Sequence, residues 1–129
     1  MLYCVMGAAT KEEAVSSKLA KRSGIALYSW RRATGLNRET FARIANFSER
    51  TLATYEKHRK LPVPVRPQIN EAIRLVRALM QIIPSEELMK WLHTPNPGFD
   101  GKRPWTLIER GERDVLWEMI HQTRQGAFA

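Results

Sequence analysis

The chain has 129 residues, enough for one domain or for two small domains that share a modest core. Its content of 43% hydrophobic and 26% charged residues is ordinary for a globular protein, so long disorder is not expected outside the ends. The single cysteine, Cys4, excludes an intramolecular disulfide and a multi-cysteine zinc site. No apolar run approaches the ~18–20 residues of a membrane span and no signal peptide is recognisable, so we expect a cytoplasmic protein without a membrane partner.

Positive charge is concentrated in the first half of the chain. Residues 1–60 contain 12 Lys and Arg against 5 Asp and Glu, a balance of +7, whereas residues 61–129 contain 9 against 8, a balance of +1. A basic surface suits a phosphate backbone, from which it releases counterions. An acidic membrane is the rival partner, but the basic residues do not line one long amphipathic face. The charge therefore favours DNA.

Two helices are predicted at the start of the chain. Residues 10–22 form the first helix, with acidic residues early and basic residues late, as the helix dipole prefers. Gly24 marks the break after it. Residues 25–34 form the second helix, which Gly35 closes in a left-handed conformation. The expected inward-facing stripes are Ala14, Val15 and Leu19 in the first helix, and Ile25, Leu27, Tyr28 and Trp30 in the second.

Residues 36–59 predict two short helices joined by a tight turn. Asn37 stands at an N-cap position, so the first of these helices begins near Arg38. Asn46 tolerates the left-handed conformation that ends a helix, and Ser48 is able to cap the next one. Two helices so arranged are typical of a helix-turn-helix, in which the second helix enters the major groove.

The second of these helices is predicted to run from Glu49 to about Arg59, with Leu52 and Tyr55 turned inward. Its remaining side chains are polar and face outward, which favours DNA binding over a purely structural helical hairpin. The residues expected to contact bases or phosphates are Arg38, Ser48, Arg50, Thr51 and Thr54.

A proline-rich segment separates the two halves. Residues 61–67 hold three prolines and are predicted to be an extended joint. Residues 68–83 then restart a helix whose apolar stripe predicts a core or dimer helix, not a cofactor site. The stripe consists of Ile69, Ile73, Val76, Leu79 or Met80, and Ile83.

Further helices are predicted up to residue 124. Residues 84–93 open with proline and acids, as helices often do, and residues 94–103 form a turn-rich loop. A short helix begins at Pro104 and Gly111 stops it. Residues 112–124 form the last helix, with Val115, Leu116, Met119, Ile120 and Thr123 turned inward. With no strand pattern, the chain is predicted to be all-α.

An enzyme is not predicted. His58, His93 and His121 are far apart in the sequence. Glu118 and His121 share a helical face, but a di-iron site needs that motif twice and two further glutamates. No nucleophile elbow and no glycine-rich phosphate loop is present, so we expect no catalytic residue, no cofactor and no bound metal.

The last five residues leave two interpretations open. A chain end normally frays, and that is the default expectation for residues 125–129. Alternatively, an aromatic residue such as Phe128, placed after the flexible Gly126 and close to Arg124, suits a plug that orders in a partner's cleft.

These residues resemble the Xre partners of RES-domain toxins, within the MbcA/ParS/Xre group of antitoxins. The resemblance covers residues 23–129 and rests on three stretches, in this order: GLNRETFARIANFSERTL, WLHTPNPGFDGKRPWTLIE and the closing QGAFA. The second stretch is similar to the family's "WL..PN..L.G..P..L" signature. Trp105 stands where a leucine is usual, and Arg110-Gly111-Glu112 is a shorter link than the family's turn.

The resemblance implies a helical protein of two parts: residues 23–62, an Xre-like helix-turn-helix domain that binds the operator of its own operon, and residues 63–129, a small helical domain that neutralises a co-expressed toxin. RES toxins are understood to act on nicotinamide adenine dinucleotide (NAD), and the antitoxin's C-terminus blocks their pocket. Residues 1–22 receive no role. The toxin-binding residues implied are Trp91, Leu92, Asn96, Pro97, Arg124, Gly126, Phe128 and Ala129, supported by Pro95, Gly101 and Pro104.

From the residue patterns and the family resemblance together we expect a non-enzymatic antitoxin and autorepressor. Its partners would be a RES-like toxin and operator DNA. A homodimer is expected, because two-fold symmetry matches paired half-sites, and a higher-order complex would form with the toxin. The alternative is a stand-alone Xre-like regulator whose C-terminal domain dimerises or senses another partner, and a more distant one is a helical adaptor that binds only protein.

Overall fold

The computed structural model describes residues 11–126, and within that range it contains eight α-helices, two short 3-10 helices and no strand. The all-α prediction is therefore confirmed for this part of the chain. None of the described helices is long and apolar enough to cross a membrane. The elements are α2 (Lys11–Ala20), α3 (Gly24–Thr34), α4 (Arg38–Ala45), α5 (Glu49–Tyr55), η1 (Val63–Val65), α6 (Arg66–Met80), α7 (Ser85–Leu92), η2 (Pro97–Phe99), α8 (Pro104–Glu109) and α9 (Arg113–Arg124).

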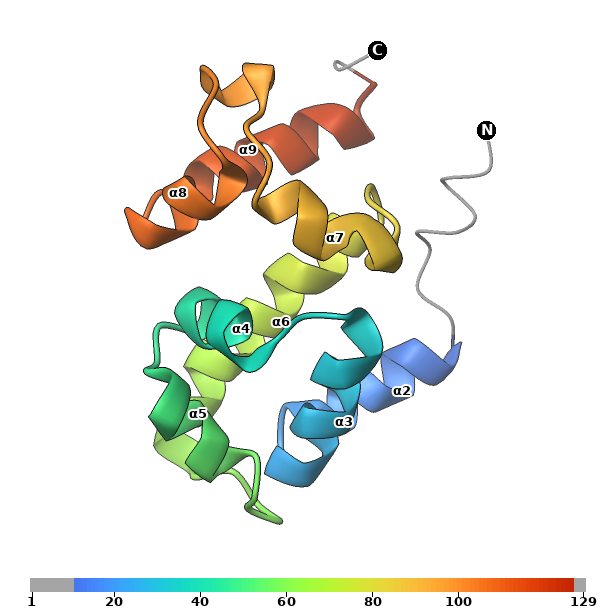
Figure 1. Cartoon of the computed structure of the whole chain (residues 1–129). Coiled ribbons are helices and arrows are strands. Elements are labelled where there is room, and N and C mark those ends of the chain that lie inside the picture. Colours follow the sequence, from blue (N-terminus) through green and yellow to red (C-terminus); the bar gives the residue numbers. More distant parts are fainter. Residues whose placement is uncertain (1–10, 127–129) are drawn as a thin grey trace.

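Helix α6 runs through the middle of the molecule, with α3, α4 and α5 toward one end and α7, α8 and α9 toward the other (Figure 1). It packs against α4, η1, α7 and α9. The predicted apolar stripe is buried, so the interpretation as a core helix is confirmed, but α6 ends at Met80 and the buried Ile83 follows it. The buried side chains from both ends of the molecule belong to one hydrophobic cluster, and α6 links the two ends.

The predicted caps of α4 and α5 are present. Asn37 Oδ1 accepts the N–H of Thr40 at 2.8 Å, and Ser48 Oγ accepts the N–H of Thr51 at 3.0 Å. Asn46 lies in the left-handed region with φ of 64°, as expected for the residue that ends α4. The starts of both helices and the turn between them thus follow from side chains that satisfy otherwise unpaired backbone N–H groups.

Helix α5 is shorter than predicted, because it ends at Tyr55 and not near Arg59. After Tyr55 the chain makes tight bonds of the i→i+3 kind, from Lys57 N–H to Thr54 O and from His58 N–H to Tyr55 O. The carbonyl of His58 then accepts the N–H of Ile25 at 3.1 Å. The contact with the start of α3 thus turns the chain away from the helix axis.

The apolar stripes predicted for α2 and α3 are partly wrong. Val15 and Leu19 are 58% and 57% exposed, whereas Ser17 and Ala20 are buried. Small side chains let α2 lie close to α3, with which it makes extensive contact. Polar bonds add to the packing: Glu13 accepts hydrogen bonds from Trp30 Nε1 and Arg77 Nε, each at 2.9 Å. In α3, Leu27 and Trp30 are buried as predicted, but Ile25 and Tyr28 are exposed.

Two other expectations need correction. Residues 61–67 are not extended throughout, because Val63–Val65 form η1 and α6 already begins at Arg66. Pro67 fits the first turn of α6, where its missing N–H breaks no helical bond. In α9, Val115 is exposed although it was predicted to face inward.

A buried ion pair connects α3 with the end of α5. Arg31 Nε lies 2.6 Å from Glu56 Oε2, and these side chains are only 4% and 2% exposed. Arg31 also donates to the carbonyl of Leu36 at 2.9 Å, while Arg38 Nε lies 2.9 Å from Glu56 Oε1. One carboxylate therefore joins α3, α4 and α5.

Gly24 allows the close approach of α3 to the end of α5. A Cβ atom at this position would lie 1.8 Å from the backbone oxygen of Tyr55. Because backbone atoms cannot move aside as a flexible side chain can, any larger residue here would push the two helices apart.

We predict that Glu56→Ala lowers the free energy of unfolding by about 3–5 kcal/mol, because it leaves the Arg31 guanidinium buried without a counter-charge. Urea denaturation measures the effect. The matched control is Glu71→Ala, which breaks the exposed pair with Arg74 and should cost about 0.5 kcal/mol or less. Equal stability of the two variants would contradict the structural role of the buried pair.

Candidate functional site

The predicted DNA-contacting residues Ser48, Arg50, Thr51 and Thr54 all come from α5 or its cap. Ser48, Arg50 and Thr54 are exposed and Thr51 is half-buried, so these side chains form one polar surface that extends from the start of the helix to its last turn. The arrangement is the one needed to lay the beginning of a helix against base edges.

The hydroxyl groups on this surface also stabilise α5. Ser48 Oγ donates to Thr51 Oγ1 at 2.8 Å, and Thr54 Oγ1 donates to the carbonyl of Arg50 at 3.2 Å. The hydroxyl donors of Ser48 and Thr54 are thus already used within the helix, whereas Thr51 Oγ1 accepts from Ser48. The exposed Arg50 guanidinium is therefore the strongest donor that the surface offers to DNA.

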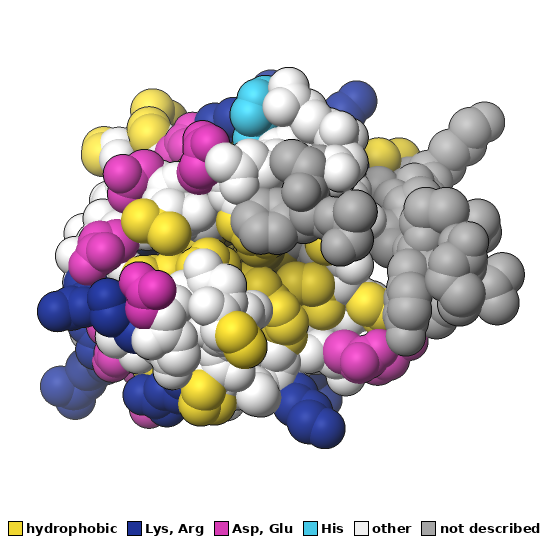
Figure 2. Space-filling model, turned by 90° about the horizontal axis from the view of Figure 1, so that it is seen from above, with side chains coloured by type: hydrophobic (Ala, Val, Ile, Leu, Met, Phe, Trp, Pro, Cys, Tyr) yellow, Lys and Arg dark blue, Asp and Glu magenta, His cyan; other side chains and the backbone are white. Residues whose placement is uncertain are grey.

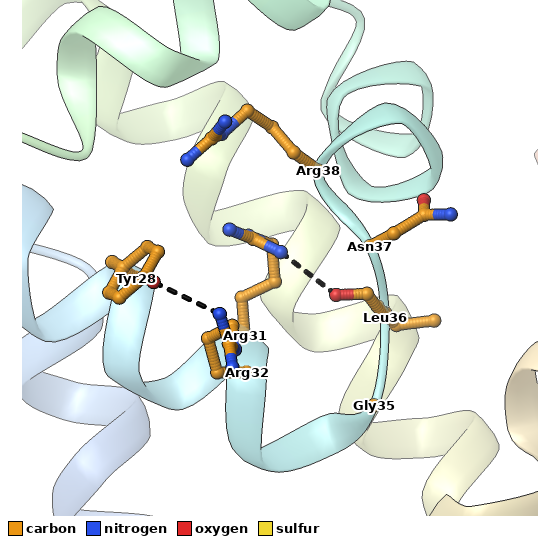
Figure 3. Close-up of a pocket in the computed structure, with 7 residues that line it drawn as sticks. All are labelled: Tyr28, Arg31, Arg32, Gly35, Leu36, Asn37 and Arg38. Carbon is orange, nitrogen blue, oxygen red and sulfur yellow. Dashed lines mark hydrogen bonds between the residues drawn. The ribbon is translucent and has the colours of Figure 1, made fainter.

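A second basic feature is an open pocket of about 430 Å3 between α3 and α4 (Figure 3). It adjoins the N-terminus of α4, where Arg38 was predicted to contact the DNA backbone. Two further arginines, from the last turn of α3, accompany it. The lining residues are Tyr28, Arg31, Arg32, Gly35, Leu36, Asn37 and Arg38.

The pocket carries more positive than negative charge. Arg31 and Arg38 share the single carboxylate of Glu56. Arg32 is exposed and donates to the hydroxyl of Tyr28 at 3.1 Å, as Figure 3 shows, and its guanidinium lies 5.7 Å from the Tyr28 ring centre. Three guanidinium groups against one carboxylate suit a phosphate group. Sequence reasoning missed Arg31 and Arg32, although a pair of arginines at the end of a helix was a visible signal.

The predicted toxin-binding residues Asn96 and Pro97 shape the loop between α7 and α8. Asn96 Oδ1 accepts the N–H of Gly98 at 2.8 Å, and the backbone carbonyl of Asn96 accepts the N–H groups of Phe99 and Gly101. The N–H of Asn96 donates to the carbonyl of Lys102, which closes the loop. Asn96 is therefore the hydrogen-bonding centre of this loop.

The other predicted toxin-binding residues differ in accessibility. Trp91 is half-buried and packs edge to face on Phe99, with ring centres 6.3 Å apart. Leu92 is fully buried, so in this structure it supports the core. Gly126 is exposed at the end of the described chain, and Phe128 and Ala129 lie outside the described residues. Arg124 is exposed, and its Nη2 donates to Gln81 Oε1 at 2.6 Å.

Arg113, which sequence reasoning also missed, connects the two halves. Its Nη2 donates to the carbonyls of Arg43 at 3.1 Å and Ile44 at 2.6 Å. The last carbonyls of a helix lack partners within the helix, so the first residue of α9 caps α4 just before the turn into α5. Gln68 of α6 adds a longer bond to the carbonyl of Ala45.

The described residues contain no cluster of three or more His, Cys, Asp or Glu side chains able to hold a metal ion. Glu118, which shares a helical face with His121, accepts a hydrogen bond from Gln122 Nε2 at 2.8 Å.

Comparison with known protein families explains the helices after α6. Residues 78–116 match the family described as "Antitoxin Xre/MbcA/ParS C-terminal toxin-binding domain". Residues 78–116 therefore form a toxin-binding domain of the Xre/MbcA/ParS antitoxin family. The resemblance to the Xre/MbcA/ParS antitoxins is thereby confirmed for this stretch, and an antitoxin of this type binds a toxin through this C-terminal domain. No curated protein and no solved structure matches the chain.

The matched stretch runs from the end of α6 to the first turns of α9. Trp91, Asn96 and Pro97 lie inside the antitoxin's toxin-binding domain, whereas Arg124 and Gly126 follow it. Arg113 also lies inside. The bonds from Arg113 to α4 are therefore direct contacts between the toxin-binding domain and the helix that precedes the turn into α5.

We predict that Arg113→Ala destabilises the antitoxin by about 1–3 kcal/mol, because two carbonyls at the end of α4 lose a charged donor. Urea denaturation measures the change in the free energy of unfolding. Arg110→Ala is the control, because Arg110 is exposed and its ion pair with Glu112 spans 3.7 Å. A destabilisation no greater than that of the control would show that Arg113 is not a significant cap of α4.

Proposed function

We propose that this antitoxin neutralises a RES-like toxin by covering its NAD-binding site with the C-terminal tail, and that it represses its own operon through α4 and α5. The observation that carries the proposal is the separation of two surfaces on one core. The polar start of α5 and the arginine pocket lie in one half, and the toxin-binding domain at residues 78–116 forms the other. One protein is thus able to bind DNA and toxin at different sites.

The basic half supports operator binding. In this proposal α5 enters the major groove with Arg50 foremost, while Arg32 and Arg38 contact the phosphate backbone at the pocket. The excess charge of residues 1–60 supplies the affinity that does not depend on DNA sequence, and α5 supplies the readout of bases. A homodimer would set two such helices on paired half-sites.

The end of α9 supports the role of the tail. The bond between Arg124 and Gln81 anchors the last turn of α9 to the residue after α6, so the residues that follow start from a fixed point. Gly126, with φ of 77°, adopts a left-handed turn that suits glycine. We propose that Phe128 and Ala129, which follow this turn, enter the toxin's pocket.

We predict that Arg50→Ala weakens operator binding by about 1–3 kcal/mol, the scale of one good base contact. Fluorescence anisotropy with operator DNA at fixed salt measures the loss. Arg103→Ala removes the same charge from an exposed position in the other half and should leave the affinity nearly unchanged. If both variants bind the operator like the wild type, the recognition surface lies elsewhere.

Deletion of residues 125–129 should abolish toxin neutralisation while operator affinity stays the same. The truncation keeps all of α9 and the Arg124–Gln81 bond, so the loss would come from the tail and not from unfolding. Growth of cells that co-express the toxin measures neutralisation, and anisotropy measures operator binding. Full protection of cells by the truncated chain would contradict the role of the tail.

The genomic neighbourhood and a pull-down separate this proposal from a stand-alone regulator. The proposal expects an adjacent reading frame that encodes a RES-like protein, and it expects that protein to co-purify with the antitoxin. Operator binding with no such gene nearby would favour the regulator instead.

A further inference from the structure

An open groove of about 520 Å3 lies between α9 and the loop that carries η2. Its apolar lining comes from Phe99, Val115 and Met119. Val115 is 36% exposed, although its sequence spacing predicted an inward-facing residue. Gly98, Asp114, Glu118 and Gln122 complete the lining. Figure 2 looks onto the end of the molecule that carries α9 and shows hydrophobic side chains in a hollow, with Asp and Glu side chains gathered beside it.

The wall opposite α9 is a rigid loop. Asn96 bonds to the N–H of Gly98, and a Cβ atom added to Gly98 would lie 3.1 Å from Asn96 Oδ1. The ring of Phe99 packs edge to face on the ring of Trp91. The loop is therefore built before any partner arrives, and a preformed groove binds at a lower entropic cost than a flexible one.

The charge of the groove contrasts with that of the rest of the chain. The antitoxin carries a formal charge of +8, yet the groove is lined by the carboxylates of Asp114 and Glu118, and its lining includes no Lys or Arg. Both carboxylates belong to exposed residues one helical turn apart on α9. Such a rim repels phosphate and attracts a cationic side chain, so the groove complements a protein partner and not DNA.

We propose that this groove is a docking site for the toxin, and that it takes an apolar side chain of the toxin next to a lysine or arginine. The inference rests on the proposed function, because the partner is the toxin that the antitoxin neutralises. Four of the lining residues, Gly98, Phe99, Asp114 and Val115, lie within the matched toxin-binding domain. The groove is a contact apart from the tail: the groove anchors the toxin and the tail covers its pocket.

Val115→Asp tests the apolar contact, because it puts a charge into the apolar lining of the groove at an exposed position that tolerates it. We expect binding of the RES-like protein encoded by the neighbouring gene to weaken by about tenfold or more, as for an apolar anchor at the centre of an interface. The matched control is Val63→Asp, at a valine that is 68% exposed and lies in η1, away from the groove.

Asp114→Asn with Glu118→Gln tests the charged rim. The double variant should weaken toxin binding and reduce its dependence on salt, because rim charges steer association. Glu87→Gln with Glu109→Gln removes the same charge from exposed positions outside the groove and should have no such effect. Circular dichroism confirms that each variant is folded, and operator binding should be unchanged in all four.

The possible outcomes distinguish a failure of the groove proposal from a failure of the proposed function. If the wild-type antitoxin captures the co-expressed toxin and the groove variants capture it equally well, the groove proposal is overturned while the proposed function stands. If Val115→Asp changes the oligomeric state of the antitoxin and not its toxin affinity, the groove binds a second copy of this chain and the proposal is also overturned. Failure of the wild-type chain to bind any RES-like protein would overturn both.

Discussion

The buried ion pair between Arg31 and Glu56 is the interaction on which the basic half depends. Glu56 follows the last residue of α5, Arg31 lies in α3, and Arg38 begins α4 and binds the other oxygen of the same carboxylate. A charge buried without a partner is costly, so the three helices are held where all of these groups are satisfied. The same contacts set the orientation of α5, whose exposed start is the proposed DNA-reading surface, and they line the pocket proposed to receive a phosphate.

The two halves of the antitoxin form one packed unit. Helix α6 contributes side chains to the core at both ends, and Arg113 of the toxin-binding domain caps the end of α4. A partner that moves the first turn of α9 would therefore act on the turn that leads into α5. The physical connection consists of two hydrogen bonds and the packing around α6, which is a short path between the proposed toxin and DNA surfaces.

The loop rich in proline and glycine before α8 is held in place by hydrogen bonds and aromatic packing. Asn96 satisfies the backbone groups of its neighbours, and η2 holds Phe99 against Trp91. The family motif that contains Asn96 and Pro97 therefore stabilises a tight loop. This loop forms one wall of the acidic groove. The toxin-binding domain therefore has a surface that differs in charge from the proposed DNA-binding half.

Local rules were sufficient to predict the helical class, the caps at Asn37, Asn46 and Ser48, and the buried stripe of α6, because each depends on residues a few positions apart. The family resemblance also followed from short motifs, whose residues lie close together in the sequence. The sequence pattern misplaced Val15, Leu19 and Val115, because an apolar residue at helical spacing is buried only if another element covers that side. The partners of Glu56 and Arg113, the three-arginine pocket and the acidic groove join residues distant in the chain. Only the tertiary packing of the helices brings those residues together.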